Sequence, residues 1–350
     1  MPTSIRKILE KNTVTASAPC RIDAGGTWDI KAMALPLEGI GPVSVNMALD
    51  LRTWVYLSPY EEGRVRISSE GFSKREEERI DRLPFDSAFG LFFAAISYFG
   101  FHGVEIRIRS DSPVKSALGG SSTALVALIK ALSKVAVLQG KKGMSGGEIL
   151  HLGYHLEDGV STGKCGIQDQ AAAVYGGANR WVWRYGNRRT PFERRALMNR
   201  DDLKALSKRI LVAFSGKSHV SAGINRRWIT DFLSGKTRSG WIEANRIVDR
   251  FASATEHMKW NGAAALLREE MAVRREITPD ALIPLTQELI DQAENRGCGA
   301  RFAGAGGGGS VWAIGSEKNI RGLREIWAGT LATVRGAGVL DCAIDPQGVL

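Results

Sequence analysis

The chain carries at residues 113–122 the stretch Pro113-Val114-Lys115-Ser116-Ala117-Leu118-Gly119-Gly120-Ser121-Ser122. Before it, apolar and charged residues alternate over 104–109 as in a strand, and after it apolar residues recur at helical spacing over 125–136. A glycine- and serine-rich loop at a helix start presents unpaired backbone N–H groups and the positive end of the helix dipole, which suits a phosphate. The alternative is an ordinary strand-to-helix turn with a serine N-cap.

The sequence has neither a Walker A loop nor a dinucleotide-binding glycine loop after an early strand. A Walker A loop needs a glycine five residues before its Gly-Lys-Ser/Thr, but Leu211 precedes Gly216-Lys217-Ser218 and Thr230 precedes Gly235-Lys236-Thr237. No Gly-x-Gly-x-x-Gly follows an early strand. The loop at 113–122 is therefore neither a Walker A loop nor a dinucleotide-binding glycine loop.

Composition indicates a globular protein with an anionic ligand. The chain has 350 residues, 44% of them hydrophobic and 24% charged, which suggests two domains. Its net charge is +10, and this favours a nucleotide or sugar phosphate as ligand. The basic residues form no run of five or more, so we expect no nucleic-acid partner.

Cysteine usage and hydropathy favour a cytoplasmic protein that does not enter a membrane. The four cysteines are far apart and predict neither a disulfide framework nor a zinc site. The N-terminus lacks the apolar segment of a signal peptide. The run Phe89–Phe101 is too short to span a bilayer and fits a buried helix capped by Asp86.

The order of predicted elements favours an α+β fold rather than a doubly wound sheet. We expect a strand over 14–23 and a hairpin made of 53–58 and 64–68. The polar, arginine-rich stretch 186–202 predicts a linker between a first domain at 1–190 and a second at 200–350.

Two further segments are rich in glycine and in groups that bind ligands. Residues 18–29 read Ala-Pro-Cys-Arg-Ile-Asp-Ala-Gly-Gly-Thr-Trp-Asp, where Asp29 could accept hydrogen bonds from ligand hydroxyls or simply belong to a surface turn. Residues 301–310 read Arg-Phe-Ala-Gly-Ala-Gly-Gly-Gly-Gly-Ser. Ordering four successive glycines costs roughly 0.5–1 kcal/mol each relative to alanine, which suggests that backbone passes very close to a ligand or another loop. A flexible linker is the alternative.

Together these three segments resemble the GHMP kinase superfamily, which includes galactokinase, homoserine kinase, mevalonate kinase and phosphomevalonate kinase. The family's Pro-Gly-Arg-x-Asn followed by a glycine turn and an aspartate corresponds to Pro19–Asp29. Its Pro-x-x-x-Gly-Leu-Gly-Ser-Ser corresponds to Pro113–Ser121, and its Gly-Ala-Gly-Gly-Gly-Gly to Gly304–Gly309. The resemblance implies a two-domain fold, with an N-terminal domain like domain 2 of ribosomal protein S5 and a C-terminal ferredoxin-like α/β sandwich.

The resemblance implies ATP and Mg²⁺ as cofactors and assigns roles to particular residues. Asp169, in Gln168-Asp169-Gln170, would be the catalytic base, Arg21 its ion-pair partner, and Ser121 and Glu157 the Mg²⁺ ligands. The residues expected to bind nucleotide are Lys115, Ser116, Ala117, Leu118, Gly119, Gly120, Ser121 and Ser122. Those expected to bind substrate are Asp23, Gly25, Gly26, Thr27, Trp28, Asp29, Gly177, Lys217 and His219. Those expected to support the phosphate loop are Gly304, Ala305, Gly306 and Gly307.

The Gly25-Gly26 form of the first motif, with Gln168-Asp169-Gln170 later, looks like the fucokinase and D-glycero-D-manno-heptose 7-phosphate kinase branch. The implied reaction is phosphorylation of a sugar or sugar-phosphate hydroxyl, the anomeric one. Lys217 and His219 could hold a substrate phosphate, or the segment could be a strand-to-helix cap.

The chain departs from the family pattern at three positions. Ala117 replaces a glycine, and its Cβ fits only if φ is negative. Cys20 also replaces a glycine, and Arg301 stands where lysine is common.

Three other functions stay open. They are a non-catalytic sensor of ATP and sugar, ATP-dependent decarboxylation of a diphosphorylated acid, and RNA binding. The oligomeric state is not determined, and a homodimer is compatible with the sequence.

Overall fold

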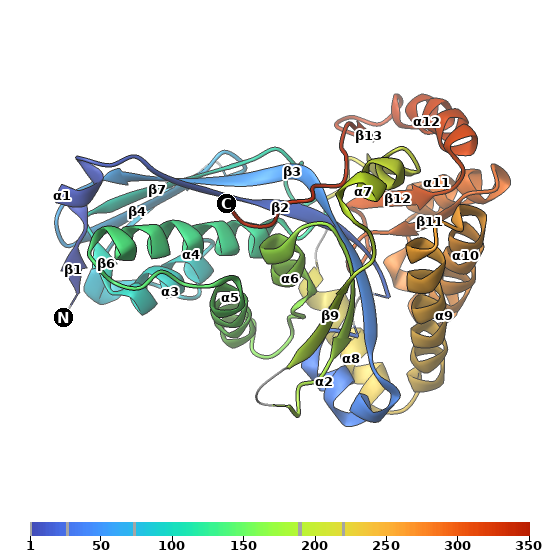
Figure 1. Cartoon of the computed structure of the whole chain (residues 1–350), viewed down its shortest axis with the longest axis horizontal. Helices are drawn as coiled ribbons and strands as arrows, with labels where there is room; N and C mark the ends of the chain where they lie inside the picture. Colours follow the sequence, from blue (N-terminus) through green and yellow to red (C-terminus); the bar gives the residue numbers. More distant parts are fainter. Residues whose placement is uncertain (1, 26–27, 73–74, 188–190, 219–220) are drawn as a thin grey trace.

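The computed structural model describes residues 2–25, 28–72, 75–187, 191–218 and 221–350 and shows two α/β units side by side (Figure 1). The first unit holds a mixed sheet with helices beneath it. The second holds an antiparallel sheet flanked by long helices. The long strands β2 (Val14–Ala24) and β3 (Val43–Pro59) run from the first unit toward the second.

The N-terminal sheet has the order β5-β4-β7-β3-β8-β9, and β2 pairs with β3 outside this path. Its remaining strands are β4 (Arg64–Ser69), β5 (Glu76–Arg79), β7 (Val104–Ser110), β8 (Ala178–Trp183) and β9 (Phe192–Ala196). Because β3 has 17 residues, one half pairs with β7 and the other with β8. A pair of short strands, β1 (Thr3–Ser4) and β6 (Phe101–His102), lies apart from this sheet.

The hairpin predicted from 53–58 and 64–68 is wrong. Strand β7 lies between β3 and β4, antiparallel to the first and parallel to the second. The alternating residues Val104, Ile106 and Ile108 are buried, as a central strand requires. Adjacent strands joined by a short turn therefore do not pair here, because a strand from later in the chain takes the central position.

Helix α4 (Gly120–Leu138) runs beneath β2 and β3 and is the centre of the N-terminal core. It is long and apolar enough to cross a membrane, with a mean hydropathy of 1.6, but 72% of that window is buried inside the protein, as in a core helix. Around it pack α3 (Gly90–Phe99), α5 (Gly146–Val160) and α6 (Gln168–Tyr175). Helix α3 has Phe89 at its N-cap, so the predicted cap at Asp86 is wrong.

Short helical segments connect these elements. They are α1 (Arg6–Leu9), α2 (Lys31–Ala34), η1 (Leu35–Ile40), η2 (Ile80–Arg82), α7 (Arg200–Ser207) and η3 (Pro279–Ala281).

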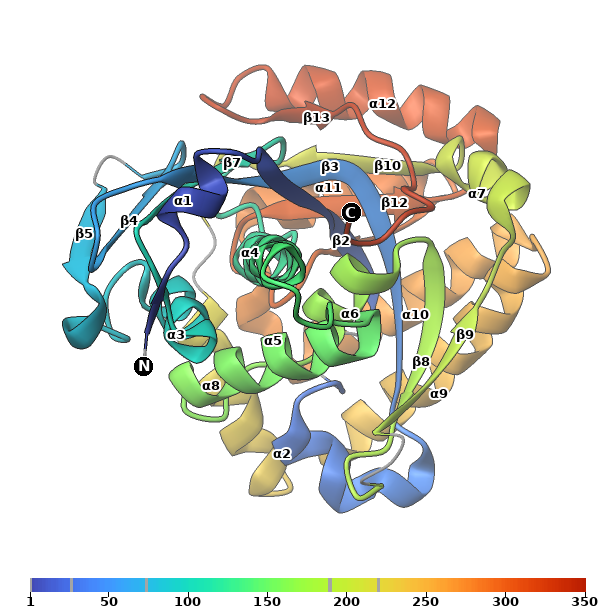
Figure 2. The ribbon, with the colours of Figure 1, turned by 60° about the vertical axis from the view of Figure 1, so that its left-hand side comes forward.

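The C-terminal sheet has the order β11-β12-β10-β13 and is antiparallel throughout. Its strands are β10 (Ile210–Phe214), β11 (Gly299–Phe302), β12 (Ser310–Ile314) and β13 (Gly338–Leu340). The helices of this unit are α8 (Ser221–Leu233), α9 (Arg238–Glu256), α10 (Trp260–Ile277), α11 (Pro284–Asn295) and α12 (Glu317–Leu331). Turning the molecule shows α9 and α10 on one side of the sheet and α12 on the other (Figure 2). This α+β architecture agrees with the predicted fold class.

The stretch 186–202, predicted to be a linker, contains β9 and the start of α7. Strand β9 pairs with β8 and so belongs to the N-terminal sheet. The division at 190 and 200 stays a prediction.

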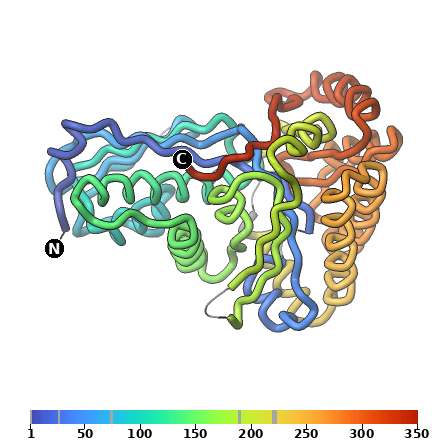
Figure 3. The backbone as a smooth tube through the Cα atoms, viewed as in Figure 1, coloured from blue at the N-terminus to red at the C-terminus, as the bar shows by residue number. Residues whose placement is uncertain are grey.

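The last residues of the chain return from the C-terminal unit to the N-terminal one (Figure 3). Leu350 exchanges backbone hydrogen bonds with Ser17 of β2, whereas the Asp345 amide donates to the Ala48 carbonyl and the Asp345 carbonyl accepts from the Gly177 amide. The buried guanidinium of Arg52 binds the Asp345 carboxylate and the carbonyl oxygens of Ser17, Gln347 and Gly348. This segment therefore ties β13 to the edge of β2 and β3.

We expect Asp345→Ala to lower the free energy of unfolding by about 3 kcal/mol, because it leaves the buried Arg52 without its counter-charge. Urea unfolding followed by circular dichroism measures this. The control is Glu243→Gln, which breaks an exposed ion pair with Arg246 and should change stability by less than about 0.5 kcal/mol. Equal effects of the two variants would show that the returning segment contributes little to stability.

Candidate functional site

A cavity of about 770 Å³ opens between the two units and collects most of the predicted site residues. Those that line it are Arg21, Asp29, Lys115, Ser116, Ala117, Gly119, Gly120, Ser121, Ser122, Glu157, Asp169, Gly304 and Ala305. They come from all three motifs and from the segments around α5 and α6. Residues as far apart in sequence as Arg21 and Ala305 thus share one cavity wall.

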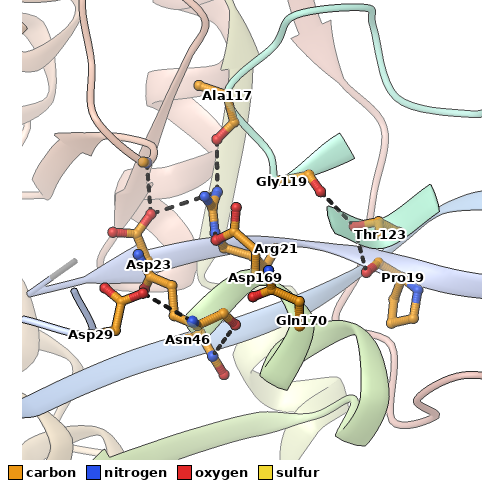
Figure 4. A network of polar contacts seen from close by, with 12 residues as sticks. Pro19, Arg21, Asp23, Asp29, Asn46, Ala117, Gly119, Thr123, Asp169 and Gln170 are labelled. Atoms are coloured by element: carbon orange, nitrogen blue, oxygen red, sulfur yellow. Dashed lines mark hydrogen bonds and ion pairs between the residues drawn. The ribbon is translucent and has the colours of Figure 1, made fainter. Parts of the chain in front are cut away.

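At the centre of this wall Arg21 and Asp169 form an ion pair (Figure 4). Arg21 Nε donates to Asp169 Oδ1 at 2.8 Å, and Arg21 Nη1 donates to the Ala117 carbonyl at 2.7 Å. Burial alone would lower the pKa of Arg21, but Asp169 and Asp23 together raise it, so the guanidinium is charged. One arginine from β2 therefore positions both the phosphate loop and the carboxylate of α6.

Behind Arg21 a chain of buried charges crosses between the units. Asp23 lies 3.7 Å from Arg21 Nη1 and accepts from Arg301 Nη1 at 2.7 Å and from the Gly304 amide at 2.7 Å. Arg301 also binds Glu270 at 3.1 Å, and all of these side chains except Arg21 are 1% exposed or less. Burial alone would raise the pKa of Asp23, but Arg301 and Arg21 hold it below its usual range. Asp23, predicted to bind substrate, is thus placed as an interdomain anchor and does not line the cavity.

The phosphate loop approaches α4 in an unusual backbone conformation. Lys115, Ala117 and Gly119 have φ of 55°, 62° and 79°, all in the left-handed region. Helix α4 begins at Gly120 with Gly119 as N-cap and no side-chain cap hydrogen bond. The serine-capped turn considered above is therefore not what forms, and the first-turn N–H groups of α4 remain for a ligand.

The left-handed φ of Ala117 overturns the expectation that its Cβ requires a negative φ. Space for that Cβ comes from the third motif, which packs against the loop. A Cβ placed on Gly309 would lie 2.6 Å from the Ala117 Cβ, and one on Gly304 would lie 3.1 Å from the Ala117 carbonyl oxygen. The glycine tract therefore allows one loop to pass very close to another, as its composition suggested.

Asp29 lines the cavity next to the segment that precedes Asp169. It is 1% exposed and accepts from the Gln168 amide at 2.9 Å. A Cβ placed on Gly166 would lie 1.8 Å from Asp29 Oδ2, so only glycine fits there. Ile30 forms an isolated antiparallel bridge with Gly166, which holds the two segments together.

Glu157 on α5 faces the start of α4. Its carboxylate accepts from Gln170 Nε2 at 2.6 Å, and it forms no ion pair with any cation in the described ranges. Burial raises the pKa of Glu157 to about 7, against the opposing hydrogen bonds from Ser122 and Gln170. Ser121 lines the same part of the cavity, so a carboxylate and a hydroxyl are available there as oxygen ligands.

Several predicted site residues lie elsewhere. Trp28 is fully buried and donates to the Trp241 carbonyl, so it packs in the C-terminal core. Lys217 is exposed outside the cavity wall, and its carbonyl accepts from the Gly309 amide. Gly25, Leu118, Gly177, Gly306 and Gly307 also do not line the cavity. Gly26, Thr27 and His219 lie outside the described residues.

Two groups of cavity residues were missed by sequence reasoning. At one end, Phe72, Phe89, Phe92 and Ile108 form an apolar wall, with the rings of Phe72 and Phe89 5.3 Å apart. The second group is Lys164, Asn225 and Arg226. The apolar residues resemble ordinary core positions, and the polar ones belong to no motif, so neither group carried a usable signal.

Comparisons with known proteins agree with this geometry. The descriptions "GHMP kinases N terminal domain" and "GHMP kinases C terminal" match residues 87–177 and 251–332. A mevalonate kinase from Thermococcus sibiricus is 26% identical over 337 residues, covering 87% of this chain and 90% of that protein.

Two solved structures have the same fold. A Lactococcus lactis galactokinase complexed with galactose aligns with a TM-score of 0.75 at 16% identity, covering 98% of each chain. A D-glycero-D-manno-heptose 1-phosphate kinase from Bacteroides thetaiotaomicron aligns with a TM-score of 0.65 at 18% identity, covering 96% of this chain and 97% of the other.

An open helix start beside an arginine–aspartate pair, in a cavity between two α/β units, is the arrangement of a small-molecule phosphotransferase. The chain has the two-domain GHMP kinase fold and matches the models of both GHMP kinase domains.

We expect Ala117→Gly to raise the free energy of unfolding by about 1 kcal/mol, because alanine at φ 62° is strained and glycine is not. Chemical denaturation measures the change. The matched control is Ala328→Gly on exposed α12, where the same substitution should cost about 1 kcal/mol. A loss of stability at both positions would contradict the strained conformation of Ala117.

Proposed function

We propose that this protein transfers the terminal phosphoryl group of ATP to a hydroxyl of a sugar or sugar phosphate, with Mg²⁺ as cofactor. The observation that carries the proposal is the Arg21–Asp169 ion pair, which opens into the same cavity as the phosphate loop. Phosphoryl transfer needs positioning and charge compensation more than covalent chemistry, and this cavity offers both. A cytoplasmic setting stays a prediction.

The donor end of the cavity is suited to ATP. The apolar wall of Phe72, Phe89 and Phe92 would receive the base. Ser116 to Ser122 and the open amides of α4 would receive the phosphates, where the helix dipole favours negative charge. Lys115 adds a cation at the entrance of this loop.

Ser121 and Glu157 would hold the metal. Mg²⁺ takes oxygen ligands, usually one or two from the protein with the rest from water and phosphate, and the donor set here fits. Held by Ser121 and Glu157, Mg²⁺ would supply charge compensation for the phosphates. A carboxylate with a pKa near 7 and no cationic partner among the described residues is a suitable group for this position.

Asp169 would accept the proton from the attacking hydroxyl, and Arg21 would orient its carboxylate. A Cβ placed on Gly119 would lie 3.1 Å from Asp169 Oδ2, so the start of α4 approaches this carboxylate closely. Asp29 would bind other hydroxyls of the acceptor. The acceptor would thus sit between the turn that ends at Asp29 and the segment 166–169.

A second candidate acceptor is mevalonate. The curated relatives that match across most of the chain are mevalonate kinases, at 23–26% identity over 87–96% of this chain. ADP release with Mg-ATP, measured over a panel of L-fucose, galactose, heptose 7-phosphate and mevalonate, distinguishes the two acceptors. ATP binding without ADP release on any acceptor would favour the non-catalytic sensor instead.

We expect Asp169→Asn to lower kcat by about 100-fold or more, because the amide keeps the hydrogen bond to Arg21 but cannot accept a proton. Binding of ATP, followed by calorimetry, should not change. The control is Asp249→Asn, an exposed partner of Arg180 outside the cavity. Near-normal turnover in Asp169→Asn would refute the assignment of the base.

We expect the apparent affinity for Mg²⁺ to rise roughly tenfold between pH 6 and pH 8, since Glu157 must be ionised to bind the metal and its pKa is about 7. The raised pKa leaves the carboxyl mostly protonated at pH 6 and mostly ionised at pH 8. Activity titrated with Mg²⁺ at fixed ATP measures the shift. Glu157→Gln controls for titration of the nucleotide itself, and the same pH dependence in that variant would exclude Glu157 as a ligand.

A further inference from the structure

The acceptor end of the cavity holds two cationic side chains that the reaction described above does not use. Lys164 lies in the α5–α6 connection, five residues before Asp169, and Arg226 lies on α8. Both line the cavity, together with Asn225. They come from different units of the fold, so the folded chain brings them to one cavity wall.

Their place in the fold puts them on the acceptor side of Asp169. Gly166, two residues after Lys164, contacts Asp29 and is bridged to Ile30. Helix α8 contacts α2, which directly follows Ile30, and Figures 1 and 2 show α8 and α2 side by side. The apolar wall that would receive the base is built from α3 and the β4–β5 region, and α3 lies away from α2 in Figure 1.

Neither cation is neutralised within the described part of the chain. Lys164 Nζ donates to the neutral Thr162 Oγ1 at 2.9 Å, and Arg226 forms no ion pair among these residues. The neighbouring Arg227 instead binds Asp280 at 2.9 Å.

The carboxylates of the cavity wall near these cations already have partners. Asp169 binds Arg21, and Asp29 accepts from the Gln168 amide. Glu157 accepts from Gln170. The charge of Lys164 and Arg226 is therefore available to a ligand.

We propose that the phosphoryl acceptor carries an anionic group, a carboxylate or a phosphate, that is bound by Arg226 and Lys164. This rests on the proposed function and narrows it, because it excludes neutral sugars as preferred acceptors. A guanidinium binds either anion through two parallel N–H donors, and the lysine ammonium adds a point charge. The anion site is therefore assigned to α8 and the α5–α6 connection instead of Lys217, which does not line the cavity.

The first test compares acceptors that differ only in the anion. Heptose 7-phosphate is paired with the free heptose, glucuronate with glucose, and mevalonate with its reduced triol. ADP release should be at least tenfold more efficient, in kcat/KM, for the anionic member of the productive pair. Whether that member carries a phosphate or a carboxylate identifies the group, and equal efficiency within the pair overturns the proposal.

The second test compares Arg226→Gln with its neighbour Arg227→Gln, which removes the same charge from a residue paired with Asp280. Arg226→Gln and Lys164→Gln should each raise KM for the anionic acceptor roughly tenfold to a hundredfold, with kcat and KM for ATP little changed. Arg227→Gln should leave all three near their original values. A rise in KM for ATP in Arg226→Gln would place this arginine on the nucleotide and overturn the proposal.

A binding experiment separates failure of this site from failure of the proposed reaction. Calorimetry measures binding of each anionic acceptor to protein saturated with a non-hydrolysable ATP analogue. If no acceptor is turned over, the proposed reaction fails, yet weaker binding to Arg226→Gln than to Arg227→Gln still supports the anion site. Equal binding to the two variants, or no binding of any anionic acceptor, overturns it.

Discussion

The ion pair of Arg21 with Asp169, buried on the arginine side and open to the cavity on the aspartate side, is the interaction on which the rest of this site depends. Arg21 holds the phosphate loop through the Ala117 carbonyl and the carboxylate of α6 through its Nε. It is held in turn by Asp23, which Arg301 and Glu270 connect to the C-terminal unit. Removing one side chain of this series of ion pairs leaves an uncompensated buried charge. The ion pairs therefore fix the two units, and the cavity between them, relative to one another.

The same coupling explains the left-handed loop and the glycine tract opposite it. Ala117 adopts a positive φ although alanine disfavours it, and its Cβ takes the space that Gly304 and Gly309 leave open. A loop of the first unit is thus shaped by a loop of the second. The resulting helix start has no side-chain cap, which leaves its amides for a ligand.

Sequence reasoning was accurate where a property depends on neighbours in the chain. The strand before the phosphate loop and helix α4 follow from periodicity, because burial of one face imposes it. It failed where partners are distant. The residues 53–58 and 64–68 have the pattern of a hairpin, but β7 lies between them in the sheet. The local sequence of neither strand indicates that a later strand takes this position. Trp28 lies within a ligand-binding motif, yet its ring packs on Trp241 and Phe232 in the C-terminal core.

The sequence by itself determined a glycine loop at a helix start and a glycine tract too costly to be unstructured. These are readable because each depends on residue type and short spacing, whereas the roles of Arg21 and Asp169 were implied only by the resemblance to the GHMP kinases. Only the tertiary structure decided that Asp23 joins the two units, that Lys217 lies outside the cavity, and that Lys164 and Arg226 line it. The physical reason is that a side chain's charge and burial depend on what the fold brings against it, and those contacts join residues more than a hundred positions apart.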